Sequence, residues 1–252
     1  MKKIIVLMLA VLLLAGCGAP EMTETAASAE PTAEQTQPPE TETVPAQTLP
    51  PVTEAPTEPP EPADDALVRV ADHIPNIRQN LLYATDRNFT GQQIYDFADA
   101  YLRYGTAKKL KAVCEELKKQ NLGILIWDGF RPLAAQEKLW EICPDPAYVS
   151  HPVTGTRSHC RGSAVDLTLV DLTTGQELTM PTGFDDFSKL ADRDYSDCPP
   201  EAAKNARLLE DVMTQCGFKP YNAEWWHYSD TDEYPVDADF VPEQTVFDGG
   251  VG

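Results

Sequence analysis

The sequence predicts a single α+β domain with a mainly antiparallel sheet flanked by helices, placed after a long unfolded N-terminal segment. Three observations favour this class. Residues 66–240 combine amphipathic helical stretches with runs of β-branched and aromatic residues. These stretches show few of the regular strand–helix alternations that a doubly wound parallel sheet needs. Their length, roughly 175 residues, suits one hydrophobic core.

Residues 1–17 are predicted to be an export signal. Lys2 and Lys3 precede an apolar run of about a dozen residues, which is short for a membrane span, and small residues follow it. The segment from Leu14 to Cys17 resembles the lipobox of bacterial lipoproteins, in which the cysteine is lipidated and becomes the new N-terminus. We therefore expect a lipid on Cys17 and a place outside the cytoplasmic membrane. A plain signal peptide is the alternative.

Residues 18–65 are predicted to be a disordered linker. They are rich in Pro, Thr, Glu, Ala and Gln and contain no Lys or Arg. Such a segment cannot bury enough apolar surface to offset the entropy lost on ordering, so it stays extended. It would tether the folded domain, residues 66–252, at a distance from the membrane.

The charge and the cysteine content argue against a nucleic-acid-binding protein and against a zinc-finger protein. The chain has 40 Asp and Glu against 20 Lys and Arg, a formal charge of −20 that repels nucleic acid. Its six cysteines include no CxxC pair, which argues against a structural zinc finger. We expect no essential disulfide and no obligatory protein partner. Cys114 and Cys216 lie on predicted core stripes and are more simply buried small hydrophobic residues.

The first helix is predicted from Thr106 to Lys119, since Thr106 is a capping residue type and apolar residues follow at helical spacing. A second helix is predicted to start after Pro199-Pro200 and to stop before Gly217. The residues on the two buried faces are Leu110, Val113, Cys114 and Leu117 for the first, and Leu209, Val212, Met213 and Cys216 for the second. Both helices are interpreted as scaffold.

Three runs are predicted strands, namely residues 123–127, 163–170 and 224–228. In the second run, alternation places Val165 and Leu167 on one face and Asp166 on the other, so that Asp166 can face a cleft. Thr173-Thr174-Gly175 is typical of a hairpin turn, which would lead into Leu178 and Met180.

The candidate site combines two of the four histidines with acidic residues. His159 stands seven residues before Asp166, and Glu224 stands three before His227. Two imidazoles and one carboxylate, with a fourth position for water, form the ligand count of a catalytic zinc site. His159, Asp166 and His227 would be ligands of one zinc ion, and Glu224 would be the base. Glu224 and His227 point to opposite sides of a regular strand, so we expect a strand end or kink there.

From spacing alone, a plainer interpretation stays open, in which both histidines are structural and Asp166 is a paired surface acid. Cys160, next to His159, could be a thiol nucleophile or a fourth ligand. Neighbouring side chains usually point apart, which favours a structural role for Cys160.

Two stretches resemble the signature of the zinc D,D-peptidases: His159-x-x-Gly162-x-Ala164-x-Asp166, and Glu224-x-Trp226-His227. Further stretches resemble the D-alanyl-D-alanine dipeptidase branch of that family, namely residues 83–91, 127–132, 161–169 and 224–228. The likeness runs from about Leu82 to Phe240. It implies the zinc D,D-peptidase fold, the ligands and base named above, and hydrolysis of D-alanyl-D-alanine in cell-wall peptide metabolism.

The resemblance also implies that Arg131 stabilises the developing oxyanion and that Asp185 receives the substrate's free ammonium group. A carboxylate at that end favours a free dipeptide over a long wall peptide. The family pattern usually has Ser two residues before the first histidine, whereas this chain has Arg157 there. Two alternatives remain: a zinc D-alanyl-D-alanine carboxypeptidase that trims stem peptides, and a non-catalytic wall-binding lipoprotein or zinc-dependent signalling domain. Intact Glu224 and Arg131 argue against the second.

Overall fold

The structure, a computed structural model, describes residues 60–245 of the chain. The predicted export signal with Cys17 lies outside the described residues, as does most of the predicted linker. The described residues form one compact unit. Within residues 60–245, we find no helix with the length and apolar character that crossing a membrane requires.

The central sheet has five strands in the order β2-β4-β5-β7-β6. β2 (Arg78–Gln79) pairs with β4 (Leu122–Asp128) in parallel, and all other pairs, through β5 (Ala164–Asp171), β7 (Glu224–Asp230) and β6 (Phe218–Tyr221), are antiparallel. A separate antiparallel pair joins β1 (Leu67–Arg69) to β3 (Tyr101–Arg103). The predicted α+β class with a mainly antiparallel sheet is confirmed, and the three predicted strands are β4, β5 and β7.

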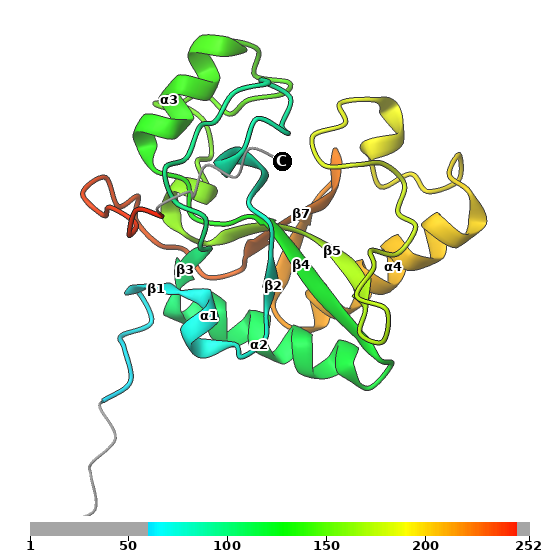
Figure 1. The fold of residues 1–252 in the computed structure, drawn as a ribbon. Helices are drawn as coiled ribbons and strands as arrows, with labels where there is room; N and C mark the ends of the chain where they lie inside the picture. The colour runs from blue at the N-terminus through cyan, green and yellow to red at the C-terminus, as the bar shows by residue number, and fades with distance from the viewer. Residues whose placement is uncertain (1–59, 246–252) are drawn as a thin grey trace, which may run out of the picture. The chain divides into compact units, whose positions relative to one another are not determined.

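Two long helices pack against the sheet. α2 (Tyr104–Lys118) contacts β4, and α4 (Pro200–Gln215) contacts β6. α3 (Leu133–Ile142) lies at the opposite end of the domain from α2 (Figure 1). The short helical elements are α1 (Val70–His73), η1 (Leu82–Ala84), η2 (His159–Arg161) and η3 (Lys189–Ala191). The site residues described below come from loops and from strands of the sheet rather than from the long helices.

The start of α2 differs from the prediction, whereas the end of α4 agrees with it. α2 begins at Tyr104, two residues before the predicted start, because the Thr106 hydroxyl donates to Asp230 Oδ2 at 2.6 Å instead of capping the helix. α4 ends before Gly217, whose φ of +90° is the left-handed conformation that glycine adopts readily at a helix terminus.

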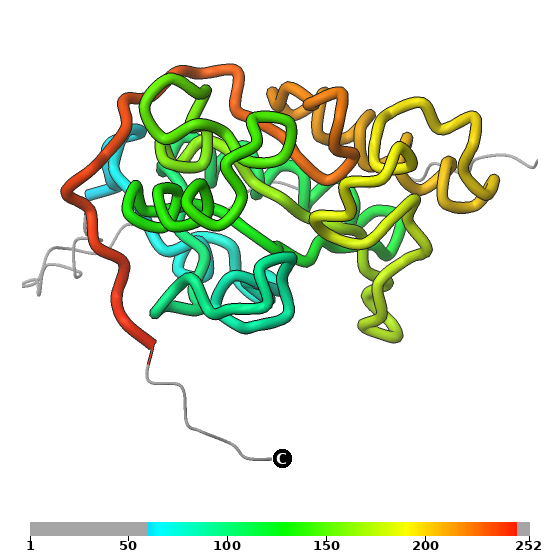
Figure 2. Tube along the Cα trace, turned by 90° about the horizontal axis from the view of Figure 1, so that it is seen from above, coloured from blue at the N-terminus to red at the C-terminus, as the bar shows by residue number. Residues whose placement is uncertain are grey.

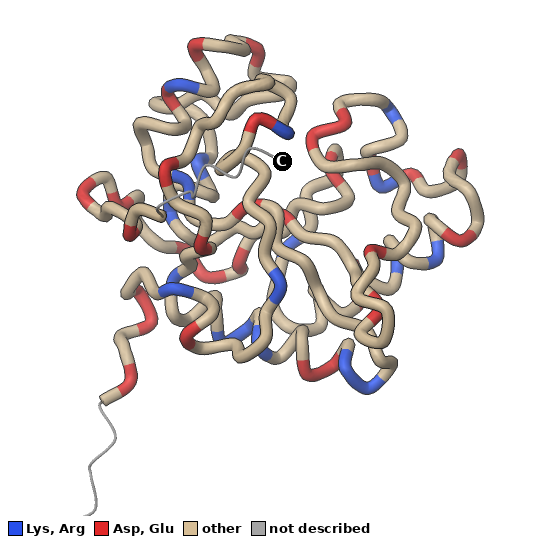
Figure 3. The backbone as a smooth tube through the Cα atoms, viewed as in Figure 1, with Lys and Arg blue, Asp and Glu red and all other residues tan. Residues whose placement is uncertain are grey.

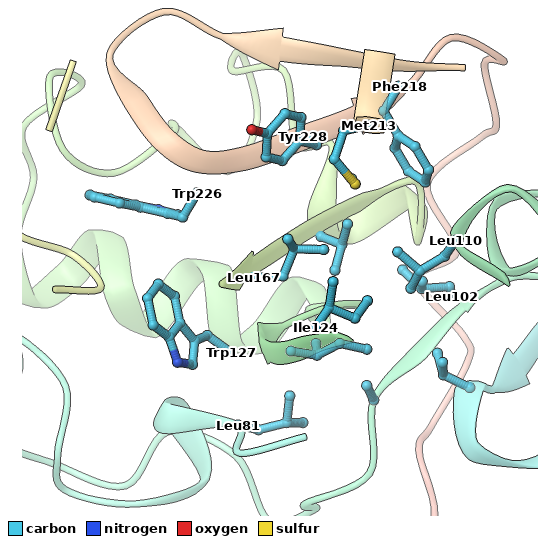
Figure 4. Packing of buried hydrophobic residues seen from close by; sticks show 14 of the residues in the cluster. Leu81, Leu102, Leu110, Ile124, Trp127, Leu167, Met213, Phe218, Trp226 and Tyr228 are labelled. Atoms are coloured by element: carbon cyan, nitrogen blue, oxygen red, sulfur yellow. The ribbon is translucent and has the colours of Figure 1, made fainter. Parts of the chain in front are cut away.

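The core forms between the sheet and the long helices. Figure 4 shows Leu167 of β5 and Ile124 of β4 in its middle, with Leu110 of α2 and Met213 of α4 packed around them. β5 is buried on both faces. Val165 and Leu167 on one face are 0 % exposed, and Asp166 on the other face is only 3 % exposed. Burial on both faces makes β5 a rigid support for the polar side chain that it carries.

The hairpin after β5 is shorter than predicted. The Gly175 amide donates to the Asp171 carbonyl at 2.7 Å, and Gly175 has a φ of +73°, so the turn forms. Beyond the turn, no second strand forms. An isolated β-bridge joins Val170 to Glu177, and Leu178 and Met180 lie outside any strand.

Both ends of the described chain contact the domain. The Gly105 amide donates to the Asp64 carbonyl at 3.0 Å, so ordered contacts begin slightly before residue 66. The last described residues run along the side of the domain (Figure 2), and the Ala98 amide donates to Thr245 Oγ1 at 2.9 Å. Acidic and basic residues are distributed along the whole described chain rather than gathered on one element (Figure 3).

Candidate functional site

Three side chains that are distant in sequence converge at one point. His227 Nδ1 lies 2.9 Å from Asp166 Oδ1, and His159 Nε2 lies 3.3 Å from Asp166 Oδ2. The two imidazole nitrogens, His159 Nε2 and His227 Nδ1, are 3.2 Å apart. These three residues are the group of His, Cys, Asp and Glu side chains in the described chain whose donor atoms could hold one metal ion.

The sheet register creates this convergence. Asp166 of β5 stands directly opposite His227 of β7, and Asp128 at the end of β4 stands opposite Asp166 on the other side. Cross-strand partners lie about 4.5–5.5 Å apart at Cβ, which brings side chains of one face into contact. The pairing of β4 with β5 shifts between Ile126 and Asp128, and this irregularity brings Asp128 into the row.

The donor spacing fits a tetrahedral divalent cation. Ligands at about 2.0–2.2 Å from zinc in a tetrahedral site lie roughly 3.3–3.6 Å from one another. The two imidazole nitrogens are 3.2 Å apart, and each lies within 3.3 Å of an Asp166 oxygen, His227 Nδ1 of Oδ1 and His159 Nε2 of Oδ2, so the three side chains are close enough to share one ion. Two imidazoles and one carboxylate leave a fourth position free, which is the arrangement of a catalytic rather than a structural zinc site.

His159 is held in the orientation that a ligand needs. His159 is the first residue of the 3₁₀ helix η2, directly after its N-cap Ser158. The Nδ1 atom of His159 lies 2.8 Å from the Gly129 carbonyl oxygen. That hydrogen bond places the proton on Nδ1 and turns the unprotonated Nε2 toward Asp166. η2 then ends at Gly162, which has a φ of +69°. Burial opposes charge on His159, but the Asp166 carboxylate raises the pKa of the imidazole.

Asp166 is the buried centre of the group. Burial alone would raise the pKa of its carboxyl, but the adjacent His159 and His227 lower that pKa well below the usual range. The carboxylate is therefore ionised at neutral pH, as a metal ligand must be.

Glu224 lies at the edge of the same group. Its Oε2 is 3.9 Å from His227 Nδ1, and burial raises the pKa of its carboxyl to about 7. Glu224 is the first residue of β7, and the pairing with β6 is irregular, because Tyr221 pairs with Glu224 while Pro220 pairs with Tyr228. The expected strand end or kink is confirmed, and it lets two residues three apart reach one site.

A residue that sequence reasoning missed holds this irregular segment. The Arg193 guanidinium donates to the carbonyl oxygens of Glu224 at 3.1 Å and His227 at 3.0 Å. It also donates to Glu210 Oε2 and the Tyr228 hydroxyl, both at 3.1 Å. Arg193 lies in a loop without a motif, so no local sequence signal pointed to it.

Arg131 is fixed by a buried network. Its Nη2 donates to Asp128 Oδ2 at 2.7 Å, and its Nη1 donates to Gln136 Oε1 at 2.8 Å. Burial opposes the charge, but the Asp128 carboxylate keeps the pKa of the guanidinium above its usual value. Gln136 in turn donates to the Ser150 carbonyl at 2.6 Å. Asp128 lies within the Trp127-Asp128-Gly129 stretch that the sequence had singled out, whereas Gln136 had no distinguishing signal.

Asp185 lines the same cleft, and its Oδ2 accepts a hydrogen bond from the Tyr83 hydroxyl at 2.7 Å. Burial raises the pKa of the Asp185 carboxyl to about 7. The residue has a φ of +53°, which is uncommon for a non-glycine residue and indicates a position imposed by its surroundings.

Cys160 does not contribute to this surface. It is 0 % exposed, it does not line the cleft, and burial raises the pKa of its thiol to about 11. A protonated buried thiol is a poor nucleophile. All five cysteines in the described part of the chain are free thiols.

These residues surround a cleft of about 800 Å³. The cleft is lined by the residues described above, namely Tyr83, Arg131, His159, Asp166, Asp185, Glu224 and His227. The loop that follows α3, residues 146–151 and 154–158, forms another wall. A metal-competent group, a carboxylate beside it and a fixed guanidinium in one cleft form the set of groups needed for hydrolysis of an amide bond.

The sequence was compared with protein families and with known proteins, and the matches are to dipeptidases. Residues 63–246 match the peptidase M15 family, described as D-Ala-D-Ala dipeptidase. The chain belongs to this family. It is 37 % identical over 175 residues to the D-alanyl-D-alanine dipeptidase of Escherichia coli K12, covering 69 % of this chain and 90 % of that protein.

Two further D-alanyl-D-alanine dipeptidases are similar. The Streptomyces coelicolor protein is 33 % identical over 198 residues, covering 68 % of this chain and 94 % of that protein. The Enterococcus faecium protein is 32 % identical over 179 residues, covering 63 % and 89 %. A solved structure of the LD-carboxypeptidase LdcB is 19 % identical with a TM-score of 0.39 and covers 71 % of each chain, a likeness too small to bear on function.

Proposed function

We propose that this chain is a zinc-dependent dipeptidase that hydrolyses D-alanyl-D-alanine to free D-alanine outside the cytoplasmic membrane. The observation that carries the proposal is the convergence of His159, Asp166 and His227, with Glu224 beside them, in a member of the D-Ala-D-Ala dipeptidase family. Three curated relatives with that name, at 32–37 % identity, support the substrate.

His159 Nε2, Asp166 and His227 Nδ1 would hold one zinc ion, because their donor atoms have the chemistry and spacing that zinc requires. Zinc in such a site supplies a Lewis acid, which polarises a carbonyl and makes water nucleophilic at neutral pH. The Gly129 carbonyl keeps the His159 ring in the orientation that presents Nε2.

Glu224 is positioned to act as general base and then as general acid. From its place 3.9 Å from His227 Nδ1, its carboxylate takes a proton from the attacking water as the water oxygen bonds to the scissile carbonyl carbon. The same proton passes to the amine nitrogen when the C–N bond breaks. The products are two molecules of D-alanine.

Arg131 would stabilise the negative charge that develops on the carbonyl oxygen. Asp128 and Gln136 occupy Nε, Nη2 and one side of Nη1, so the guanidinium keeps its position before substrate arrives. A donor that is already oriented costs no reorganisation during the reaction, which is the main source of electrostatic stabilisation in enzymes.

Asp185 would receive the free ammonium group of the substrate. Its carboxyl lines the cleft and is held by Tyr83, with no cationic partner within 4 Å among the described residues. A substrate ammonium supplies that missing charge, which favours a free dipeptide over a peptide whose amino group is blocked.

The export signal and the Cys17 lipobox support a lipid-anchored location outside the cytoplasmic membrane. Replacing Cys17 by Ser should release the protein from the membrane fraction. Continued membrane association of the Cys17→Ser protein would argue against a lipid on this residue.

The activity is tested with full-length protein in detergent, loaded with zinc. We expect D-alanine release from D-Ala-D-Ala, none from L-Ala-L-Ala, and loss of activity with a chelator that zinc restores. Faster release from a stem pentapeptide than from the dipeptide would favour a carboxypeptidase instead. No release from either would refute the proposal.

A further inference from the structure

The imidazole of His227 has a second polar contact, on the side of the ring opposite the proposed metal ligands. Its Nδ1 lies 2.9 Å from Asp166 Oδ1, whereas its Nε2 lies 3.2 Å from Ser229 Oγ. Ser229 stands two residues after His227 in β7, so both side chains project from the same face of the sheet. Each nitrogen of this imidazole therefore has a polar neighbour of its own.

The sheet fixes the position of Ser229. In the centre of the sheet edge, Ser229 pairs with Ala164 of β5 on one side and with Lys219 of β6 on the other. The main chain of His227 is fixed as well, because its carbonyl oxygen accepts a hydrogen bond from Arg193 at 3.0 Å. The freedom left to His227 is rotation of its ring. A hydroxyl that is already in place can restrict this rotation without the entropy cost of ordering a water molecule.

The two imidazoles of the site are held in complementary ways. His159 presents Nε2 while its Nδ1 is bonded to the Gly129 carbonyl, and His227 presents Nδ1 while its Nε2 contacts Ser229. A neutral imidazole carries one proton, and the nitrogen that binds a metal must be the one without it. The metal-binding form of His227 therefore has its proton on Nε2, where the Ser229 oxygen can accept it.

The contact with Ser229 is the one that is compatible with a bound ion. Without a metal, His227 Nδ1 can donate a hydrogen bond to the Asp166 carboxylate. An ion at the proposed position takes both this nitrogen and the carboxylate as ligands, so that hydrogen bond is lost. Among the contacts that the described residues make with the two nitrogens of the ring, the Nε2 contact with Ser229 then remains to orient it.

We propose that Ser229 is a positioning residue of the metal site, whose hydroxyl accepts the Nε2 proton of His227 and holds Nδ1 toward the ion. The proposal rests on the zinc site of the proposed function and deepens it, because it names a contact that sets the affinity of that site. Hydrogen-bond partners of metal-binding imidazoles are typically worth about 10- to 100-fold in metal affinity. In this role Ser229 contacts a ligand and not the reacting atoms.

The test measures the zinc affinity of metal-free, full-length protein in detergent, by competition with a chromophoric chelator. The variants are Ser229→Val and Ser229→Thr, which have nearly the same size and differ in the hydroxyl. The control is Ser196→Ala, since Ser196 is an exposed serine in the loop before α4 and does not line the cleft. The melting temperature of each metal-free protein is measured as well.

We expect Ser229→Val to raise the zinc dissociation constant by about 10- to 100-fold. Ser229→Thr and Ser196→Ala should bind zinc about as tightly as the wild type, because the first keeps an acceptor for Nε2 and the second is remote. The metal-free melting temperatures should agree, since the hydroxyl contacts a ligand rather than the core. Equal dissociation constants for Ser229→Val and Ser229→Thr would overturn the proposal.

The zinc dependence of activity distinguishes this role from a direct contact with the substrate. Ser229→Val should lose its turnover of D-Ala-D-Ala at limiting zinc and regain it when zinc is in large excess, with KM for the dipeptide unchanged. The ligands and the base are intact in this variant, which is why added zinc restores it. A raised KM together with wild-type zinc affinity would assign Ser229 to substrate binding and overturn the proposal.

Failure of the proposed function would give a different result. If the wild type releases no D-alanine while Ser229→Val still weakens zinc binding relative to Ser229→Thr, the dipeptidase assignment fails and the role of Ser229 stands. If the wild type hydrolyses D-Ala-D-Ala and all variants bind zinc equally, the role of Ser229 fails and the dipeptidase assignment stands. A wild type that binds no zinc would refute both.

Discussion

Arg131 and Asp128 form a buried ion pair, with Nη2 2.7 Å from Oδ2, and the same carboxylate oxygen lies 3.6 Å from His159 Nδ1. Asp128 is 0 % exposed and also accepts a hydrogen bond from the Tyr95 hydroxyl at 2.8 Å. One buried carboxylate thus supports both the guanidinium proposed for the oxyanion and a proposed metal ligand.

Asp128→Asn should be strongly destabilising, because it leaves the Arg131 charge buried without a partner. We expect a loss of about 3–5 kcal/mol in the free energy of unfolding, measured in urea. The control is Asp72→Asn, since Asp72 pairs with Arg69 at the surface, where the loss should stay below about 1 kcal/mol. Equal losses for the two variants would contradict the buried role of Asp128.

Removal of a proposed ligand should remove the metal. His227→Ala is expected to lower zinc content from one ion per chain to below about a tenth, because the open site would keep only two protein ligands. His73→Ala is the matched control, since His73 packs against the Tyr104 ring away from the cleft. Zinc content is measured by mass spectrometry of the metal after gel filtration. Full zinc retention in His227→Ala would place the metal elsewhere.

Glu224→Gln should separate metal binding from proton transfer. The amide has nearly the same size as the carboxyl but cannot accept a proton, so kcat should fall by about 10²–10⁴-fold while zinc content stays at one per chain. Glu141→Gln, at an exposed position of α3, should retain full activity. A Glu224→Gln protein with more than a tenth of the wild-type kcat would exclude Glu224 as the base.

Activity should depend on the ionisation of Asp185. Burial raises the pKa of its carboxyl to about 7, so the group is mostly protonated below pH 7 and ionised above it. Only the ionised form attracts a substrate ammonium, and the base Glu224, whose pKa burial also raises to about 7, must be ionised as well, so kcat/KM should fall by up to about a hundredfold for each pH unit well below 7. Asp185→Asn should have a low kcat/KM and a shallower fall, about tenfold for each pH unit, because only Glu224 still titrates there. The pH profiles of the two proteins check this, and identical profiles would contradict it.

Gly162 should resist substitution. It has a φ of +69°, and a Cβ there would lie 2.4 Å from Leu67 Cδ2. Gly162→Ala is therefore expected to cost more than about 1 kcal/mol of stability and to loosen the turn that carries His159. At Gly183 a Cβ would have no atom within 4 Å, so Gly183→Ala should change the melting temperature by only a degree or two. Equal melting temperatures for both variants would refute the expectation.

Local sequence patterns were sufficient to predict the main helices and strands and the chemistry of the site. Periodicity placed α2 and α4 to within a few residues, and β-branched and aromatic runs placed β4, β5 and β7. Residue type and motif were enough to select His159, Asp166, Glu224 and His227, because few side chains can bind zinc or transfer a proton. Spacing alone left structural histidines open as an interpretation, and the family resemblance was needed to assign the roles of Arg131 and Asp185.

Which of these groups lie in contact depends on how the strands and loops pack in the folded domain. The cross-strand register places Asp128, Asp166 and His227 in one row, although Asp166 and His227 are 61 residues apart in the chain. The pairing irregularity of β6 and β7, held by Arg193, brings Glu224 to the site. Register and loop contacts depend on packing summed over the whole domain. No local pattern therefore shows that Arg131 has partners and that Arg157 has none among the described residues.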